Sequence, residues 1–143
     1  MPPYVQAALI CDKVLIEGDG TFSIIRAIDR VFAGAEFTEK DPLLFTCHLM
    51  ICVRPSVSEA PAPVQVRIEI ISPSGKRQMI GGKTVAMASF GGANLNNVLV
   101  VQFGTPGVYR FVISLNGQEA SRVSLDVVAG APAVGAPAPA DAG

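Results

Sequence analysis

The chain has 143 residues and a formal net charge of −1, with 50% hydrophobic and only 16% charged residues. Soluble domains usually carry about a quarter charged residues, so either small Ala and Gly residues dominate this surface or another subunit covers part of it. The 11 Lys and Arg residues are scattered, which argues against binding to nucleic acid or anionic lipid. The length suits a single domain with one core.

The N-terminal apolar run at 4–16 is predicted to be a buried strand rather than a secretion leader. It lacks a basic segment before it and a small-residue cleavage pattern after it. No stretch of the sequence reaches the ~18 apolar residues of a membrane span. We therefore expect a cytoplasmic protein, or a virion component if the sequence is phage-encoded.

Strand patterns continue along the chain. Val64, Val66, Ile68 and Ile70 alternate with polar residues, and the apolar run 43–53 predicts a long central strand. Further strands are expected at 21–28, 77–80, 85–90, 98–103, 108–115 and 121–128. About 7–9 short strands with almost no helix predict an all-β, antiparallel, immunoglobulin-like β-sandwich over residues 1–128. The Ala/Pro/Gly-rich segment 129–143 is expected to be a flexible, extended tail.

Turn-forming residues separate the expected strands. The segments 17–20 (EGDG) and 72–75 (SPSG) predict hairpins. The Pro-rich segment 56–63 is expected to cross between sheets or to follow an edge. The segment 91–97 (GGANLNN) is expected to be a long polar loop.

The last two strands predict a hairpin with a register correction. A two-residue turn at Asn116 and Gly117 would place Phe111 opposite Arg122 and so set core residues against charges. Aligning the apolar residues of the two strands requires one extra residue. We therefore expect a three-residue loop or a β-bulge beside Gly117.

The entry to the first of these two strands, 106–111 (PGVYRF), resembles the tyrosine corner of immunoglobulin-like sandwiches. The resemblance implies structural roles for Gly107 and Tyr109, with the phenol bonded to backbone in a neighbouring connection. The chain lacks the Trp and the cysteine pair of antibody domains, so the likeness concerns architecture only.

A second resemblance spans residues 4–128. It rests on 9–12 (LICD), 20–24 (GTFSI), 27–29 (AID) and 106–111 (PGVYRF) in this order, with a long apolar strand and a Pro-Ser-Gly turn between them. These segments are similar to a bacterial family of small, uncharacterised β-sandwich proteins. The resemblance implies the fold and no established activity.

Residues that could carry chemistry are few. His48 lies in an apolar strand with no Ser or Asp beside it, so a partly buried histidine with a hydrogen-bond partner is expected. Cys11, Cys47 and Cys52 lack CxxC spacing and are expected to be reduced core residues. The run 81–84 (GGKT) lacks the first glycine of a phosphate-binding loop, and the acidic residues of the first turn lack a calcium-loop pattern. We expect no catalytic residue, cofactor or metal site, and hence no enzyme.

These observations favour a non-catalytic structural or interaction module that self-assembles or binds a protein partner. An accessory or decoration subunit of a larger assembly, such as a phage particle, is one specific form. The candidate interface residues, which lie where a face that is not core would expose apolar side chains, are Val98, Val100, Val108, Arg110 and Val112. The tail is either dispensable or an arm that lies on a neighbouring subunit. The alternative is a ligand-binding or enzymatic sandwich with a pocket among the loops near 91–97 and 56–63.

Overall fold

The computed structural model describes residues 2–55, 62–87 and 92–130. Within these residues the chain forms nine β-strands and no helix. The strands are β1 (Tyr4–Ile16), β2 (Phe22–Ala27), β3 (Arg30–Phe32), β4 (Leu43–Arg54), β5 (Val64–Ile71), β6 (Arg77–Val85), β7 (Ala93–Phe103), β8 (Gly107–Leu115) and β9 (Gln118–Val128). The all-β fold class is confirmed.

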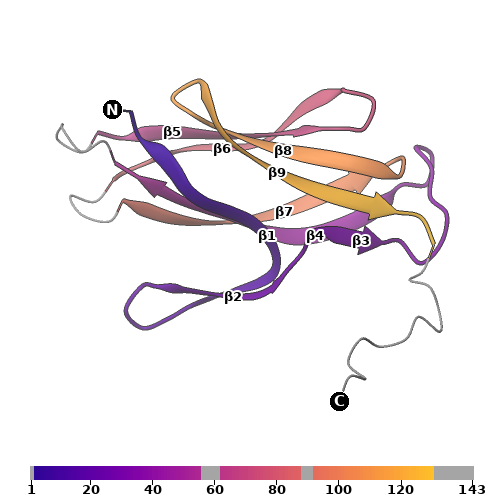
Figure 1. Cartoon of the computed structure of the whole chain (residues 1–143), viewed down its shortest axis with the longest axis horizontal. Coiled ribbons are helices and arrows are strands. Elements are labelled where there is room, and N and C mark those ends of the chain that lie inside the picture. The colour runs from indigo at the N-terminus through magenta and orange to yellow at the C-terminus, as the bar shows by residue number, and fades with distance from the viewer. Residues whose placement is uncertain (1, 56–61, 88–91, 131–143) are drawn as a thin grey trace, which may run out of the picture.

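The strands form two sheets that pack face to face (Figure 1). Sheet A has the strand order β2-β1-β4-β7, and sheet B has the order β3-β9-β8-β5-β6. Neighbouring strands are antiparallel, except that the three-residue β3 pairs with β9 in parallel, an edge strand that the sequence did not indicate. β4 and β5 lie in different sheets, so the connection between them joins one sheet to the other. Most of that connection, 56–61, and the tail beyond residue 130 lie outside the described residues.

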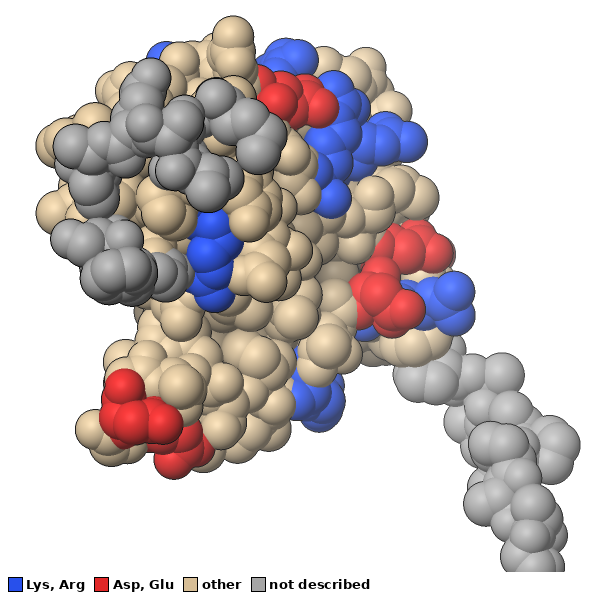
Figure 2. Space-filling model, turned by 60° about the vertical axis from the view of Figure 1, so that its left-hand side comes forward, with Lys and Arg blue, Asp and Glu red and all other residues tan. Residues whose placement is uncertain are grey.

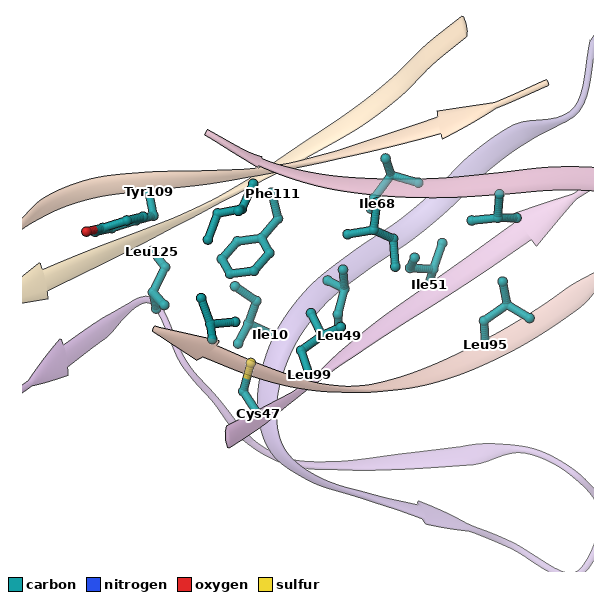
Figure 3. Close-up of a cluster of buried hydrophobic side chains, with 14 of the residues drawn as sticks. Ile10, Cys47, Leu49, Ile51, Ile68, Leu95, Leu99, Tyr109, Phe111 and Leu125 are labelled. Atoms are coloured by element: carbon teal, nitrogen blue, oxygen red, sulfur yellow. The ribbon is translucent and has the colours of Figure 1, made fainter. Parts of the chain in front are cut away.

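Apolar side chains fill the layer between the sheets (Figure 3). Strand alternation directs Leu49 and Ile51 of sheet A toward Ile68 and Phe111 of sheet B, and all four are almost completely buried. Among the described residues no polar or charged residue is buried. Full burial of such a side chain stabilises a fold by ~1.5–3 kcal/mol, so this layer is the main source of stability.

The β8–β9 hairpin contains the register correction that the sequence predicted. Asn116 and Gly117 have φ values of 50° and 83°, the positive values that a two-residue type I′ turn requires. The pairing then shifts by a β-bulge in β9, so that Phe111 lies opposite Val123 rather than Arg122. The correction therefore lies a few residues beyond Gly117, and it keeps the apolar side chains of both strands on the core face.

Two strands differ from their expected bounds. β6 runs unbroken from Arg77 to Val85, where the sequence suggests separate strands at 77–80 and 85–90, because it pairs along the whole length of β5. β7 begins at Ala93, inside the expected loop 91–97, because it pairs with β4 without any register shift from Ala93 to Phe103. Long-range pairing decides both cases against local turn signals.

Tyr109 forms a tyrosine corner at the start of β8. Its hydroxyl donates a hydrogen bond of 2.7 Å to the backbone carbonyl of Thr105 in the β7–β8 connection. Its ring lies 4.6 Å from that of Phe103, centroid to centroid. The side chain is 4% exposed, so it fixes the connection between the sheets from inside the core.

Gly107 is required at the same corner for a steric reason. Its φ of 136° is one that residues with a side chain rarely adopt. A Cβ atom at this position would lie 2.7 Å from Cγ of Pro73, which belongs to the turn between β5 and β6. The absence of a side chain thus lets this turn pack against the start of β8.

We expect Tyr109→Phe to lower the free energy of unfolding by about 1 kcal/mol, because the part-buried hydrogen bond from the phenol to the carbonyl of Thr105 is lost. Urea denaturation followed by circular dichroism measures the change. Tyr4, the second tyrosine, is 47% exposed, so Tyr4→Phe is the matched control and should change stability by less than ~0.5 kcal/mol. Equal effects of the two substitutions would show that the corner contributes nothing specific.

Candidate interaction surface

The outer face of sheet B is rich in charge. Every long strand of this sheet contributes charged side chains, and ion pairs join Arg77 to Glu69 at 3.1 Å and Arg122 to Glu119 at 2.7 Å. Figure 2, a view of the whole molecule, shows that charged side chains gather in separate groups rather than covering the surface evenly. Exposed pairs of this kind add little stability, but they keep water on the face that bears them. Sheet B is therefore a poor candidate for an apolar contact.

The central strands of sheet A carry no charge over a long stretch. Neither 43–53 in β4 nor 93–103 in β7 contains an Asp, Glu, Lys or Arg. Near β1, part of this outer face is covered, because Cys11 and Met50 cluster with Phe22 and Ile24 of the β1–β2 hairpin. Figure 1 shows this hairpin extending away from the rest of the sheet.

Toward β7 the outer face of sheet A is open. Leu44, Val98 and Val100 are 63%, 61% and 69% exposed. On this face Leu44 lies opposite Gln102, the pair next to the one that Val100 forms with Thr46, so Leu44 and Val100 are diagonal neighbours. We call Leu44, Val98 and Val100 the β4–β7 patch. A cluster of exposed large apolar side chains on an uncharged face is typical of an interaction site.

The structure separates the valines that the sequence singled out. Val98 and Val100 belong to the β4–β7 patch, whereas Val108 and Arg110 are exposed on the outer face of sheet B. Val112 is completely buried, so its expected place in an exposed patch is wrong. Its cross-strand neighbours are Glu69 and Arg122, and long side chains of this kind cover an apolar residue with their stems.

Three asparagines near the start of β7, expected to mark a loop pocket, are instead part of the sheet. Asn96 Oδ1 accepts a hydrogen bond of 2.8 Å from Nδ1–H of His48. Asn94 accepts from Arg54 at 3.2 Å, and Asn97 donates to the carbonyl of Leu49 at 3.1 Å. Among the described residues they bind neighbouring strands and do not converge on a common site, while much of the expected pocket region, 56–61 and residue 91, lies outside the described residues.

A cleft of about 680 Å³ opens at the other end of β7, between this strand and β6. Its lining includes Tyr109, whose hydroxyl is already bonded to backbone, and the charged residues Glu39 and Lys76. Neither the histidine nor any cysteine lines it. The cleft therefore provides space beside the free edge of β7 but no paired nucleophile and base.

The cysteines are poorly suited to nucleophilic chemistry. All three are free thiols, and Cys11 and Cys47 are completely buried. Burial raises the pKa of Cys11, and it raises the pKa of Cys47 to about 11, with a smaller contribution from nearby Cys11. Among the described residues, no group of three or more His, Cys, Asp or Glu side chains lies close enough together to hold a metal ion.

The acidic side chains of the first hairpin serve its turn. The carboxylate of Asp19 accepts hydrogen bonds from the hydroxyl and the backbone N–H of Thr21 at 2.6 and 3.0 Å. The bond from the hydroxyl is the main reason that the pKa of Asp19 lies below its ordinary value. Glu17 accepts a bond of 2.6 Å from Ser23.

We expect the free energy of unfolding to fall between about pH 9 and 11, partly through Cys47. In this range the unfolded chain releases the thiol proton, whose ordinary pKa is 9.0, while the folded chain retains it until about 11. The unfolded state is therefore favoured as the pH rises, by at most about 1.4 kcal/mol per pH unit.

Urea titrations at several alkaline pH values test this expectation. Cys47→Ala should flatten the pH dependence, whereas Leu99→Ala, at the cross-strand neighbour of Cys47, should lower stability by a similar amount at every pH. The expectation fails if the native chain and Cys47→Ala lose stability with the same slope.

The two-sheet architecture and the tyrosine corner define an immunoglobulin-like β-sandwich. The sequence matches the Family of unknown function (DUF6941) over residues 6–128, and the chain belongs to this family. No curated protein matches the sequence. No helix among the described residues is long and apolar enough to span a membrane.

Solved structures from several bacteria resemble this fold at low sequence identity. An immunoglobulin-like protein from Pseudomonas aeruginosa is 15% identical, with a TM-score of 0.38. The match covers 89% of this chain and 97% of the Pseudomonas aeruginosa protein. The alkylpurine DNA glycosylase AlkC from Pseudomonas fluorescens, bound to DNA with an abasic site analogue, is 10% identical, with a TM-score of 0.50. A β-glucosidase from Listeria innocua is 9% identical, with a TM-score of 0.48.

The match covers 88% of this chain but 30% of the glycosylase, and 89% of this chain but 16% of the glucosidase. At such identities a structural likeness concerns the fold alone. The activities of these larger proteins therefore carry no information about this chain.

Proposed function

We propose that the chain is a non-catalytic interaction module and that the β4–β7 patch is its contact surface for a protein partner. The observation that carries this proposal is the contrast between the two outer faces. Sheet B bears ion pairs, whereas Leu44, Val98 and Val100 are exposed on strands without any Asp, Glu, Lys or Arg. Removing such side chains from water contributes roughly 25 cal/mol per Å² of apolar surface, a gain that offsets part of the entropic cost of association.

The hydrogen bonds of the face support the same proposal. His48, the only histidine of the chain, is half-buried between the strands and bonded to Asn96. The polar side chain opposite Val98 is thus bonded within the sheet, and this bond need not be replaced when a partner covers the patch. An accessory or decoration subunit of a larger assembly, such as a phage particle, would use a face of this kind.

A photoreactive amino acid placed at Val98 or Val100 tests this proposal in the cell that makes the protein. We expect illumination to yield a discrete protein adduct from either position, which mass spectrometry then identifies. Val108 is the matched control, because it is an exposed valine (40%) on the charged outer face of sheet B. The same probe at Val108 should give no adduct of that mass.

An adduct from Val108 that equals those from Val98 and Val100 would contradict the proposal, and so would the absence of an adduct from all three positions. All three variants should fold, since the replaced side chains are exposed to solvent. Thermal unfolding followed by circular dichroism confirms this for each purified variant.

A further inference from the structure

The edges of the two sheets differ in their protection against pairing with another strand. An unprotected edge exposes backbone N–H and C=O groups that can extend the sheet, and proteins block it with short strands, charges, proline or bulges. At the two edges of sheet B, β3 has only three residues, and β6 carries Arg77 and Lys83 and has an extra residue, Ile80, where its pairing with β5 shifts register. At one edge of sheet A, β2 has six residues and includes Arg26.

β7, at the other edge of sheet A, has none of these devices. It spans eleven residues without a charge or a proline, and its pairing with β4 shows no register shift. Val98 and Val100, which are both exposed, alternate along its outer side. The cleft between β6 and β7 leaves space along the C-terminal half of this edge, at Val100 and Gln102.

We propose that the occupant of this edge is β7 of a second copy of the chain, paired in the antiparallel direction about a two-fold axis at Leu99. Sheet A would then continue from one copy into the next. This proposal rests on the proposed function, because it names the partner that the proposed contact surface binds.

The register follows from the side chains. Pairing centred at Leu99 places Val98 of one copy opposite Val100 of the other, and Asn96 opposite Gln102, with each pair formed twice. Apolar residues then meet apolar ones and amides meet amides, as favourable cross-strand pairs require. Shifting the centre by one residue in either direction would place a valine opposite an amide.

The absence of charged residues from β7 makes pairing with a second copy of itself favourable. In a two-fold antiparallel pair each strand meets itself, so a charged strand would set like charges near one another. β7 has no charge and meets no such repulsion. The main-chain hydrogen bonds of the extended sheet would provide affinity, and the paired valines would provide the register.

Light scattering coupled to size-exclusion chromatography, across a wide range of concentrations, tests the inference on the full chain. We expect the native chain to reach the mass of two copies, and the double variant Val98→Lys, Val100→Lys to keep the mass of one. Lysine is a side chain that natural edge strands use against pairing. Val108→Lys is the matched control on sheet B and should dimerise like the native chain.

Disulfide formation tests the register. In a Cys52→Ala background, Asn96→Cys and Gln102→Cys chains should form a covalent dimer when mixed under mild oxidation, because directly opposite residues have Cβ atoms within about 5 Å. A dimer of either variant alone should form far less of the covalent product, because the introduced cysteines of its two copies would lie several residues apart along the paired strands. Equal yields from the mixture and from either chain alone would overturn the register.

The possible outcomes separate this inference from the proposed function. A native chain that stays monomeric at every concentration, while the probes at Val98 and Val100 capture a different protein, would overturn the second copy and leave the contact surface standing. A dimer that survives both lysines but is lost in Val108→Lys would overturn both.

Discussion

Burial of apolar side chains between the two sheets is the interaction on which the rest of the molecule depends. Among the described residues the layer contains no buried polar or charged residue, so close apolar packing holds the two sheets together, while strand hydrogen bonds act within each sheet. Tyr109 contributes its ring to this layer and ties the β7–β8 connection to it through Thr105. Because the inner faces are fully used, only outer faces and edges remain for contact with other molecules.

The two outer faces differ in charge and in how far they are covered. Sheet B is covered by long charged side chains, which also explain the burial of Val112. Sheet A is uncharged over β4 and β7, and the β1–β2 hairpin shields the part around Met50. The open part consists of the β4–β7 patch and the free edge of β7. The uncharged surface of the molecule is therefore gathered on one outer face, over β4 and β7, and this makes that face a distinct candidate contact surface.

Much of the fold could be predicted because it follows from local alternation. The pattern at Val64–Ile70 and the mismatch of apolar residues around Asn116 and Gly117 are visible in the sequence, and both describe the structure correctly. The N-terminal end of β7 could not be predicted in this way, because its asparagines become strand residues only through pairing with β4. Which valines are exposed also depends on cross-strand neighbours, as Val112 shows, and these are set by long-range register.

Backbone hydrogen exchange followed by mass spectrometry, compared between dilute and concentrated solutions of the native chain, tests the role of the β7 edge most directly. The account predicts that amides within Ala93–Phe103 exchange more slowly in the concentrated sample, because those at the free edge acquire partners there, while the amides of β8 and β9 exchange at unchanged rates. Slower exchange confined to sheet B, or identical exchange along β7 at both concentrations, would contradict it.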